Sequence, residues 1–209
     1  MAREQGLAGQ FDADSATVRS IYDEWAPVYD GDLASWGYEA PRVAVGLLAA
    51  RTSQDDQIVD MGCGTGLVGV ELAARGYHDV VGIDVSSESL DIAAESTHYR
   101  AVAEHDLTSL PTGILDATFG GLICVGVMTY LPEVEATCRE FCRIVEPGGT
   151  IVVTQRSDLF VARDTPAAFE RLERDGSWTI HEVTESRPYL PGHQEYEGIG
   201  VHYGVFGRR

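Results

Sequence analysis

Three glycines at alternate positions follow a short β-rich run that contains an acidic residue, in the segment Ile58-Val-Asp-Met-Gly-Cys-Gly-Thr-Gly66. Because Gly62, Gly64 and Gly66 carry no Cβ, a ligand can lie directly against the backbone amides of a strand-to-helix turn. The N-terminus of the helix that follows is a favourable place for such contacts. The pattern predicts a binding loop for a nucleotide-type ligand.

The subsegment Gly64-Thr-Gly-Leu-Val-Gly69 also satisfies the dinucleotide fingerprint G-x-G-x-x-G, and Asp84 follows about twenty residues later, as that fingerprint expects. Asp60 favours a different ligand, because an anion two residues before the first glycine would repel a pyrophosphate. S-adenosylmethionine (SAM) has an ammonium and a sulfonium where NAD has phosphates. The sequence therefore favours SAM, and a nicotinamide oxidoreductase is the less favoured enzyme class.

Acidic residues also end the next two apolar runs. Val80-Val-Gly-Ile-Asp84 predicts a second strand whose carboxylate can accept hydrogen bonds from both ribose hydroxyls, and Ala101-Val-Ala-Glu-His-Asp106 predicts a third whose acid can accept from an adenine amino group. Taken alone, each acid is more readily explained as a helix cap. Ligands of open α/β sheets bind at the carboxyl ends of the strands, where these acids and the residues after Val125 would converge. Their joint occurrence behind a glycine loop favours the cofactor interpretation.

The order of these features resembles the class I SAM-dependent methyltransferases over roughly residues 21–154, with Phe119-Gly-Gly-Leu-Ile-Cys-Val125 as a fourth strand and Glu146-Pro-Gly-Gly149 as the turn before a fifth. Tyr22-Asp-Glu-Trp-Ala-Pro-Val-Tyr-Asp30 with Ala40-Pro-Arg-Val-Ala-Val45 looks like the methyltransferase-like protein encoded in the Williams-Beuren syndrome region and its bacterial relatives. One departure is Gly120, where the family usually has a structural Asp. The residues expected to contact SAM are Tyr22, Tyr29, Asp60, Gly62, Cys63, Gly64, Gly66, Leu67, Asp84, Val85, Asp106, Leu107 and Val125.

Strand and helix patterns alternate from residue 57 to 155, which predicts an α/β fold with a doubly wound, mostly parallel sheet. The resemblance implies a Rossmann-like sheet of seven strands, completed by an antiparallel hairpin from residues 178–184 and 199–206. At 209 residues the chain suits one domain. We expect an N-terminal helical arm or lid (1–52), a cofactor-binding core (53–155) and a C-terminal substrate-side segment (156–209).

Caps and breakers predict the helices. We expect Ser15 to cap a helix that Pro27 breaks. In the cofactor-binding core, we expect Gly76 to end one helix and Ser86 or Ser87 to cap the start of the next. Further helices are predicted over residues 41–51, 132–145 and 166–174. We expect residues 15–37 to become ordered over the cofactor, with Tyr29 and Tyr22 reaching its methionine end. The alternative is a permanently docked helix whose aromatic side chains only fill the core.

Fifteen basic residues against 33 acidic ones give a formal net charge of −18. Such a field repels polyanions and anionic lipid surfaces, so neither nucleic acid nor a membrane is expected as a partner. The sequence has no basic start followed by an apolar run and no apolar stretch of about 20 residues, and we expect a cytoplasmic monomer or homodimer. Four scattered cysteines without a nearby histidine pair predict neither a disulfide framework nor a metal site.

Methyl transfer from a sulfonium requires in-line positioning and exclusion of water, so the chain needs no catalytic triad. An oxygen or nitrogen nucleophile can still need a base. The candidates after the fourth and fifth strands and near the C-terminus are Tyr130, Arg156, His181, His193, Glu195 and His202. His193 stands out because the loop Pro188-Tyr-Leu-Pro-Gly-His193 should project beyond the sheet, although a surface histidine without a role is the commoner case. We take His193 and Tyr130 as the catalytic candidates and expect His78, His98 and His105 to face solvent.

The predicted function is transfer of a methyl group from SAM to an O, N or C atom of a small molecule by in-line displacement. Three alternatives stay open: a SAM-binding protein that does not methylate, a SAM-dependent enzyme of another reaction type, and a methyltransferase with a protein acceptor.

Overall fold

The apolar runs of the sequence form the central strands of one sheet in a computed structural model that describes residues 13–209. The parallel strands lie in the order β3-β2-β1-β4-β5: Ala101–Glu104, Val80–Asp84, Ile58–Met61, Phe119–Cys124 and Val145–Arg156. Strand β8 (Gly200–Arg208) pairs antiparallel with β5 and with the edge strand β6 (Trp178–Val183), and the short β7 (Arg187–Pro188) also pairs with β8. The predicted doubly wound, mostly parallel α/β fold is confirmed.

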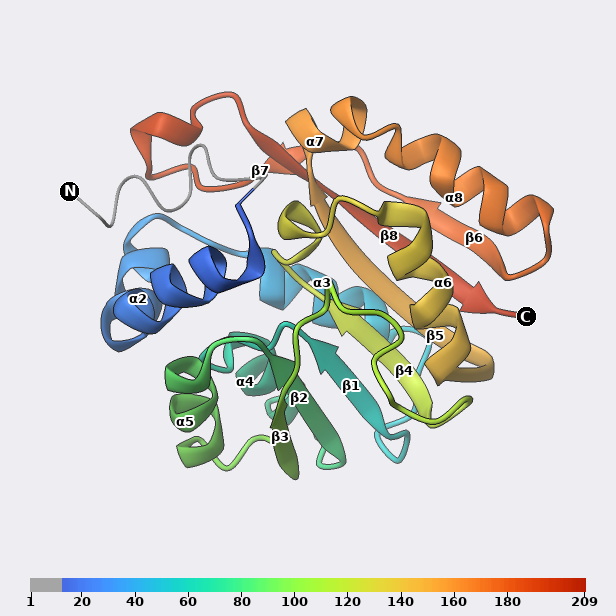
Figure 1. Ribbon diagram of the computed structural model, residues 1–209, viewed down its shortest axis with the longest axis horizontal. Coiled ribbons are helices and arrows are strands. Elements are labelled where there is room, and N and C mark those ends of the chain that lie inside the picture. The colour runs from blue at the N-terminus through green and yellow to red at the C-terminus, as the bar shows by residue number, and fades with distance from the viewer. Residues whose placement is uncertain (1–12) are drawn as a thin grey trace.

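Helices cover both faces of the sheet (Figure 1). On one face, α3 (Ala40–Ala49), α4 (Leu67–Ala73) and α5 (Ser87–Glu95) contribute to a buried apolar cluster, while α6 (Val134–Ile144) and α8 (Thr165–Arg174) contribute to a second cluster on the other face. The central strands carry apolar residues at consecutive positions because both of their faces are covered. In β1, Ile58 belongs to the first cluster, and Val59 and Met61 belong to the second.

The N-terminal arm contains α2 (Ser15–Ser35), a single helix of 21 residues that continues through Pro27. The prediction that Pro27 breaks this helix is wrong. A proline inside a helix removes one backbone donor, but here Trp25 and Leu33 are buried against the core and hold both flanking turns. The Trp25 Nε1 also donates to Asp32 Oδ2 at 2.8 Å across the proline.

The capping predictions have mixed outcomes. The Asp14 carboxylate, not Ser15, caps α2, because its Oδ1 accepts from Thr17 N at 2.8 Å. Ser86 caps α5 through its Oγ, as predicted, and Gly76 ends the turn after α4 with a φ of +87°. No helix between residues 13 and 209 combines the length and the apolar character that a bilayer crossing requires.

The C-terminal part differs from a simple hairpin. Strands β6 and β8 pair antiparallel as predicted, but β8 lies between β5 and β6, and residues 184–199 form an extended excursion that contains β7 and the short 3-10 helix η2 (Gln194–Tyr196). The helix α7 (Ser157–Ala162), directly after β5, was not predicted. This excursion brings Tyr189 and Leu190 into the same apolar cluster as α3 and α4.

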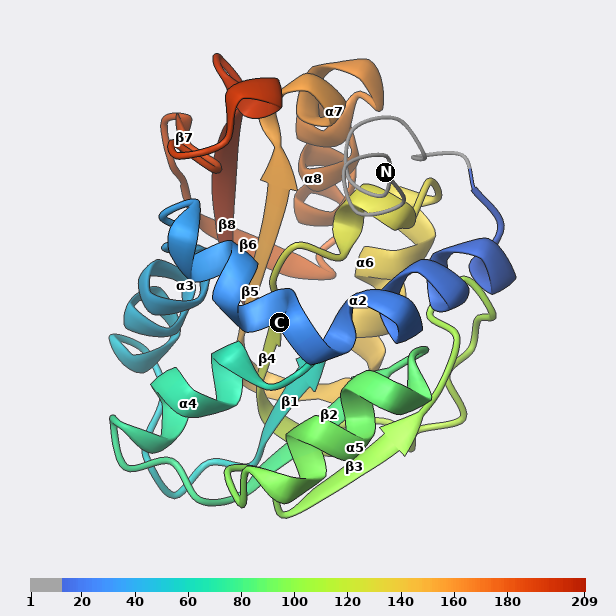
Figure 2. The ribbon, with the colours of Figure 1, turned by 90° about the vertical axis from the view of Figure 1, so that its left-hand side faces the viewer.

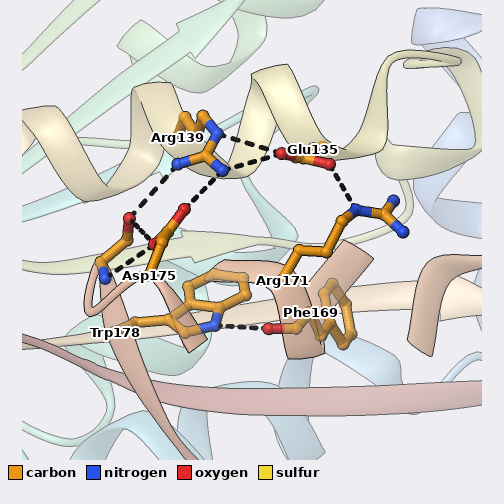
Figure 3. A network of polar contacts seen from close by, with 7 residues as sticks. Glu135, Arg139, Phe169, Arg171, Asp175 and Trp178 are labelled. Carbon is orange, nitrogen blue, oxygen red and sulfur yellow. Dashed lines mark hydrogen bonds and ion pairs between the residues drawn. The ribbon is translucent and has the colours of Figure 1, made fainter. Parts of the chain in front are cut away.

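An ion-pair network joins α6 to α8 on the face of the sheet opposite α3, α4 and α5 (Figure 3). Glu135 accepts from Arg139 Nη2 at 2.8 Å and from Arg171 Nε at 2.7 Å, and Arg139 also contacts Asp175 at 2.6 Å. These side chains are 34% to 44% exposed, so solvent screens their attraction. Beneath them, Trp178 is fully buried, stacks on Phe206 and donates to Phe169 O at 3.0 Å.

We predict that Glu135→Ala lowers the free energy of unfolding by about 1 kcal/mol or less, because exposed ion pairs contribute little. Trp178→Ala should lower it by about 3–5 kcal/mol, because it leaves a cavity and removes a buried aromatic contact. Urea unfolding followed by circular dichroism measures both. A larger loss in Glu135→Ala than in Trp178→Ala would contradict the assignment of stability to the buried cluster.

Candidate cofactor and active site

The loop between β1 and α4 is built by its glycines. Gly62, Gly64 and Gly66 have φ values of +84°, +53° and +107°, a region that favours glycine. A Cβ on Gly62 would collide with the Val127 side chain, whereas one on Gly64 would meet no atom within 4 Å. The Gly64 backbone therefore faces open space, as the sequence predicted for a loop that holds a ligand.

The Asp84 carboxylate fixes this loop from the neighbouring strand. Its Oδ2 accepts from Gly64 N at 2.8 Å and its Oδ1 accepts from Ser86 N at 2.9 Å. Burial raises the pKa of Asp84, and the hydrogen bonds from these backbone amides oppose that rise. Asp84 is not the cap of α5, since Ser86 has that role, and it also lines the cavity described below.

Asp106 follows β3 and lies at the same edge of the sheet. Its Oδ1 accepts from the backbone N and the Oγ1 of Thr108 at 2.8 and 2.7 Å. Burial alone would raise the pKa of Asp106, but hydrogen bonds from Thr108 and Ser15 outweigh it and lower the pKa. Asp106 is thus kept ionised beside the first turn of α2.

These groups line one cavity at the carboxyl ends of the parallel strands, where open α/β sheets bind their ligands. Helix α2 passes over this end of the sheet next to α5 (Figure 2). The structure brings ten of the predicted site residues together as lining: Tyr22, Tyr29, Gly62, Gly64, Asp84, Val85, Asp106, Leu107, Val125 and Tyr130.

Polar contacts that the sequence analysis missed hold α2 over the cavity. Asp23 Oδ1 accepts from Ser86 Oγ at 2.6 Å, and Asp30 Oδ1 accepts from Thr65 Oγ1 at 2.5 Å. Arg19 Nη1 contacts Glu104 Oε1 at 2.7 Å. The signal in the sequence was the spacing of these charges at helical intervals on α2, opposite hydroxyl residues in the two loops.

The comparisons with known proteins agree with this geometry. The profile of a methyltransferase domain family matches residues 59–153. Human methyltransferase-like protein 27 is 33% identical over 171 residues, which cover 79% of this chain and 69% of that protein. The chain belongs to the class I SAM-dependent methyltransferases. The family resemblance drawn from the sequence is confirmed, and the enzyme uses SAM.

Two further proteins are similar to this methyltransferase, one in sequence and one in fold. The ubiquinone biosynthesis O-methyltransferase of Chromobacterium violaceum is 31% identical over 102 residues, which span 46% of this chain and 42% of that protein. A chain in the complex between the Haloferax volcanii Trm112 methyltransferase activator and a methyltransferase superposes with a TM-score of 0.71, covering 91% of this chain and 97% of that one. At 19% identity, the second likeness shows the fold alone.

Asp60 does not line the cavity of the methyltransferase, although the sequence predicted direct contact with the cofactor. It is fully buried, and its Oδ2 accepts from the Tyr99 hydroxyl at 2.7 Å. That hydroxyl accepts in turn from Gly69 N at 3.0 Å, and a Cβ on Gly69 would lie 2.6 Å from the Tyr99 ring. The third glycine of the fingerprint therefore makes room for a tyrosine that connects Asp60 to α4.

Three other predicted contacts, Cys63, Gly66 and Leu67, also lie outside the cavity lining. Gly66 caps α4, Leu67 begins that helix, and the buried Cys63 side chain lies beside Gly82 in β2. Successive residues of this loop face opposite sides: Gly62 and Gly64 present their backbone to the cavity, while the Cys63 side chain points to the core. Among residues 13–209, no three His, Cys, Asp or Glu side chains gather as a metal site would require.

The structure does not bring His193 to the cavity. Its ring lies 4.5 Å from that of Trp36, edge to face, and its Nδ1 accepts from Glu195 N at 3.3 Å. The loop folds back onto the end of α2 because Gly192 N donates to Trp36 O at 2.9 Å. The catalytic role of His193 stays a prediction, with its side chain outside this lining. Of the histidines in the described chain, it is His105 that lines the cavity, and its side chain is half-exposed.

Tyr130 does reach the cavity, from the 3-10 helix η1 (Met128–Tyr130) after β4. Its hydroxyl accepts from the Tyr22 hydroxyl at 3.0 Å, and burial raises the pKa of Tyr130. Arg156 is not among the lining residues; it pairs with Asp158 at 2.7 Å and contacts the ring faces of Tyr189 and Tyr196. The other candidates, His181, Glu195 and His202, are not among the lining residues.

We predict that Asp60 makes the stability of the protein depend on pH. Burial and the nearby Asp84 raise the pKa of Asp60 to about 7 from 3.8, so the folded state holds this proton more tightly than the unfolded chain. The free energy of unfolding should therefore fall as the pH rises from about 4 to about 7. In Asp60→Asn that loss should disappear, a difference on the order of a few kcal/mol at pH 8 and near zero at pH 4.

Urea unfolding of both proteins between pH 4 and pH 8 measures the effect. Tyr99→Phe is the matched control, because it removes the donor to Asp60 and should steepen the dependence. Parallel curves for the parent and Asp60→Asn over this range would contradict the prediction.

Proposed function

We propose that the enzyme transfers the methyl group of SAM to an O, N or C atom of a small-molecule acceptor by in-line displacement. The observation that carries the proposal is that one cavity joins two different ends. The glycine loop, Asp84 and Asp106 form a polar end, and Tyr22, Tyr29, Tyr130 and Tyr189 line the other. A cofactor held at the first end would direct its methionine part to the second.

The polar end suits adenosine. Asp84 would accept from the ribose hydroxyls and Asp106 from the adenine amino group, with Val85 and Leu107 as apolar contacts for the ring. The open space at Gly64 leaves room beside the backbone of the loop. Bound SAM supplies an activated methyl group, so the chain has to bind, orient and exclude water, and it needs no covalent catalysis.

Three observations support a small acceptor. Helix α2 covers the cavity and is hydrogen-bonded to both neighbouring loops, which leaves little room for a polymer chain. The net charge of −18 disfavours nucleic acid. The similar Chromobacterium violaceum protein is an O-methyltransferase of ubiquinone biosynthesis, which is small-molecule chemistry.

We predict that Gly64→Val abolishes binding of SAM and of S-adenosylhomocysteine (SAH), because the side chain fills the open space and is strained at a φ of +53°. Asp84→Ala should weaken binding by about 1–3 kcal/mol through lost charge-assisted hydrogen bonds. NAD should bind much more weakly than SAM. Calorimetry with each ligand measures these affinities.

Gly31→Ala is the matched control, since Gly31 lies in α2 and an added Cβ there meets no atom within 4 Å. Its SAH affinity should equal that of the parent. Tighter binding of NAD than of SAM would overturn the proposal, and parent-like binding by Asp84→Ala would leave that residue only its structural role. Release of SAH from SAM in a metabolite extract then tests turnover and identifies the acceptor.

We further propose that α2 not only covers the cavity but also becomes more ordered when the cofactor binds, as a lid would. Amide hydrogen exchange over residues 15–37 should slow by at least tenfold when SAH binds, because the cofactor would add contacts to Tyr22 and Tyr29. The backbone amides of α6 and α8 provide an internal reference, because their exchange should not change when SAH binds. Equal protection of α2 with and without SAH would show a permanently docked helix.

A further inference from the structure

The aromatic end of the cavity is a partial box. The Tyr22 ring lies 5.8 Å from that of Tyr130 at 88° and 6.0 Å from that of Tyr29 at 61°. Because these rings are inclined to one another instead of stacked, they form walls that face different directions. Tyr189 adds a fourth ring to the same lining. We call these four residues the tyrosine box.

The box has no cationic partner for an anion. Among the described residues that line the cavity, none is arginine or lysine, and the acidic side chains there are those of Asp84 and Asp106. Arg156 is not in this lining and lies 5.9 Å from the Tyr189 ring. Its charge acts to lower the pKa of Tyr130, but it is paired with Asp158. An anionic acceptor would therefore be desolvated beside carboxylates and would gain no counter-charge.

Among the residues that the structure describes, the four tyrosines of the box offer no base. The carboxylates in the same lining, Asp84 and Asp106, belong to the polar end, where the proposed function assigns them to the ribose and the adenine amino group. Burial raises the pKa of Tyr22, Tyr29 and Tyr130, so their hydroxyls stay protonated at neutral pH. His105, the histidine in the lining, follows β3, whereas Tyr130 follows β4, and these strands are three spacings apart in the sheet. Three spacings correspond to roughly 14 Å, which is too far for direct proton transfer to an acceptor in the box.

We propose that the acceptor is an uncharged amine carried on an apolar group, methylated at nitrogen inside the tyrosine box. This inference rests on the proposed function and specifies its substrate. Of the three atoms O, N and C, the nitrogen of an amine that has already lost its proton to solvent has a lone pair ready to react, so no base is needed inside the box. A neutral hydroxyl would need the base that the box lacks.

The reaction conserves charge within the cavity. The nitrogen lone pair forms the new N–C bond, and the C–S bond breaks with its electron pair left on sulfur. The positive charge passes from sulfur to nitrogen, so the products are an ammonium ion and the neutral thioether. Tyrosine faces attract a cation on either atom, most strongly where water is excluded. Any proton on the product nitrogen leaves only after release to solvent.

Three soluble probes of nearly the same shape test this assignment: choline, its neutral carbon analogue 3,3-dimethylbutan-1-ol, and the anion 3,3-dimethylbutanoate. Each is titrated by NMR into the full-length protein saturated with SAH. We expect choline to bind at least tenfold more tightly than the neutral analogue, and the anion not to bind. In Tyr130→Leu the preference for the cation should fall severalfold, and in Tyr130→Phe, which keeps the ring, it should remain.

Equal affinity for the cation and its neutral analogue, tighter binding of the anion, or binding of none of the three probes would overturn the inference. So would loss of the preference in Tyr130→Phe, since that would assign it to the hydroxyl. Calorimetry of SAH with each variant separates the two levels of the argument. If SAH itself fails to bind the parent, the proposed function fails; if SAH binds and the probes show no preference, only the amine assignment fails.

Discussion

The contact on which the site depends is the pair of hydrogen bonds from Gly64 N and Ser86 N to one carboxylate, that of Asp84. It joins the loops that follow two adjacent parallel strands, β1 and β2, so the floor of the cavity is one rigid unit. Two further elements are placed by contacts with these loops. Thr65 and Ser86 donate hydrogen bonds that hold α2, and Val127, after β4, lies against Gly62. A buried carboxylate is costly in this position, and amide donors offset part of that cost.

Local rules predicted the fold well because the strands are buried on both faces and the loops require glycine. The positive φ values of Gly62, Gly64 and Gly66 follow from a tight turn between strand and helix, and the Ser86 cap and the Gly76 stop follow from the chemistry of helix ends. The same rules placed Asp84 and Asp106 at one edge of the sheet, and the structure shows both lining the cavity. Residues at strand ends are predictable because the topology fixes where they lie.

The differences between expectation and structure concern contacts between distant parts of the chain. Tyr99 lies 39 residues from Asp60, and nothing in either segment indicates that its hydroxyl donates to that carboxylate. Likewise, Pro27 would break an isolated helix, but tertiary burial of Trp25 and Leu33 overrides local preference. His193 was placed by assuming that a loop rich in proline and glycine projects outward, whereas the Gly192 amide ties it to the end of α2. Each case shows packing that outweighs a local signal.

Helix α2, which covers the cavity, is the first described element to leave the ribosome, and the residues that it contacts are synthesised much later. Asp30 contacts a residue 35 positions further on, Asp23 one that is 63 positions further, and Tyr22 one that is 108 positions further. During synthesis, the contacts of α2 are therefore completed only after the strand before Tyr130 has been made. Contacts of such long sequence separation form late and slowly. The chain thus completes its scaffold before it encloses the space where the chemistry takes place.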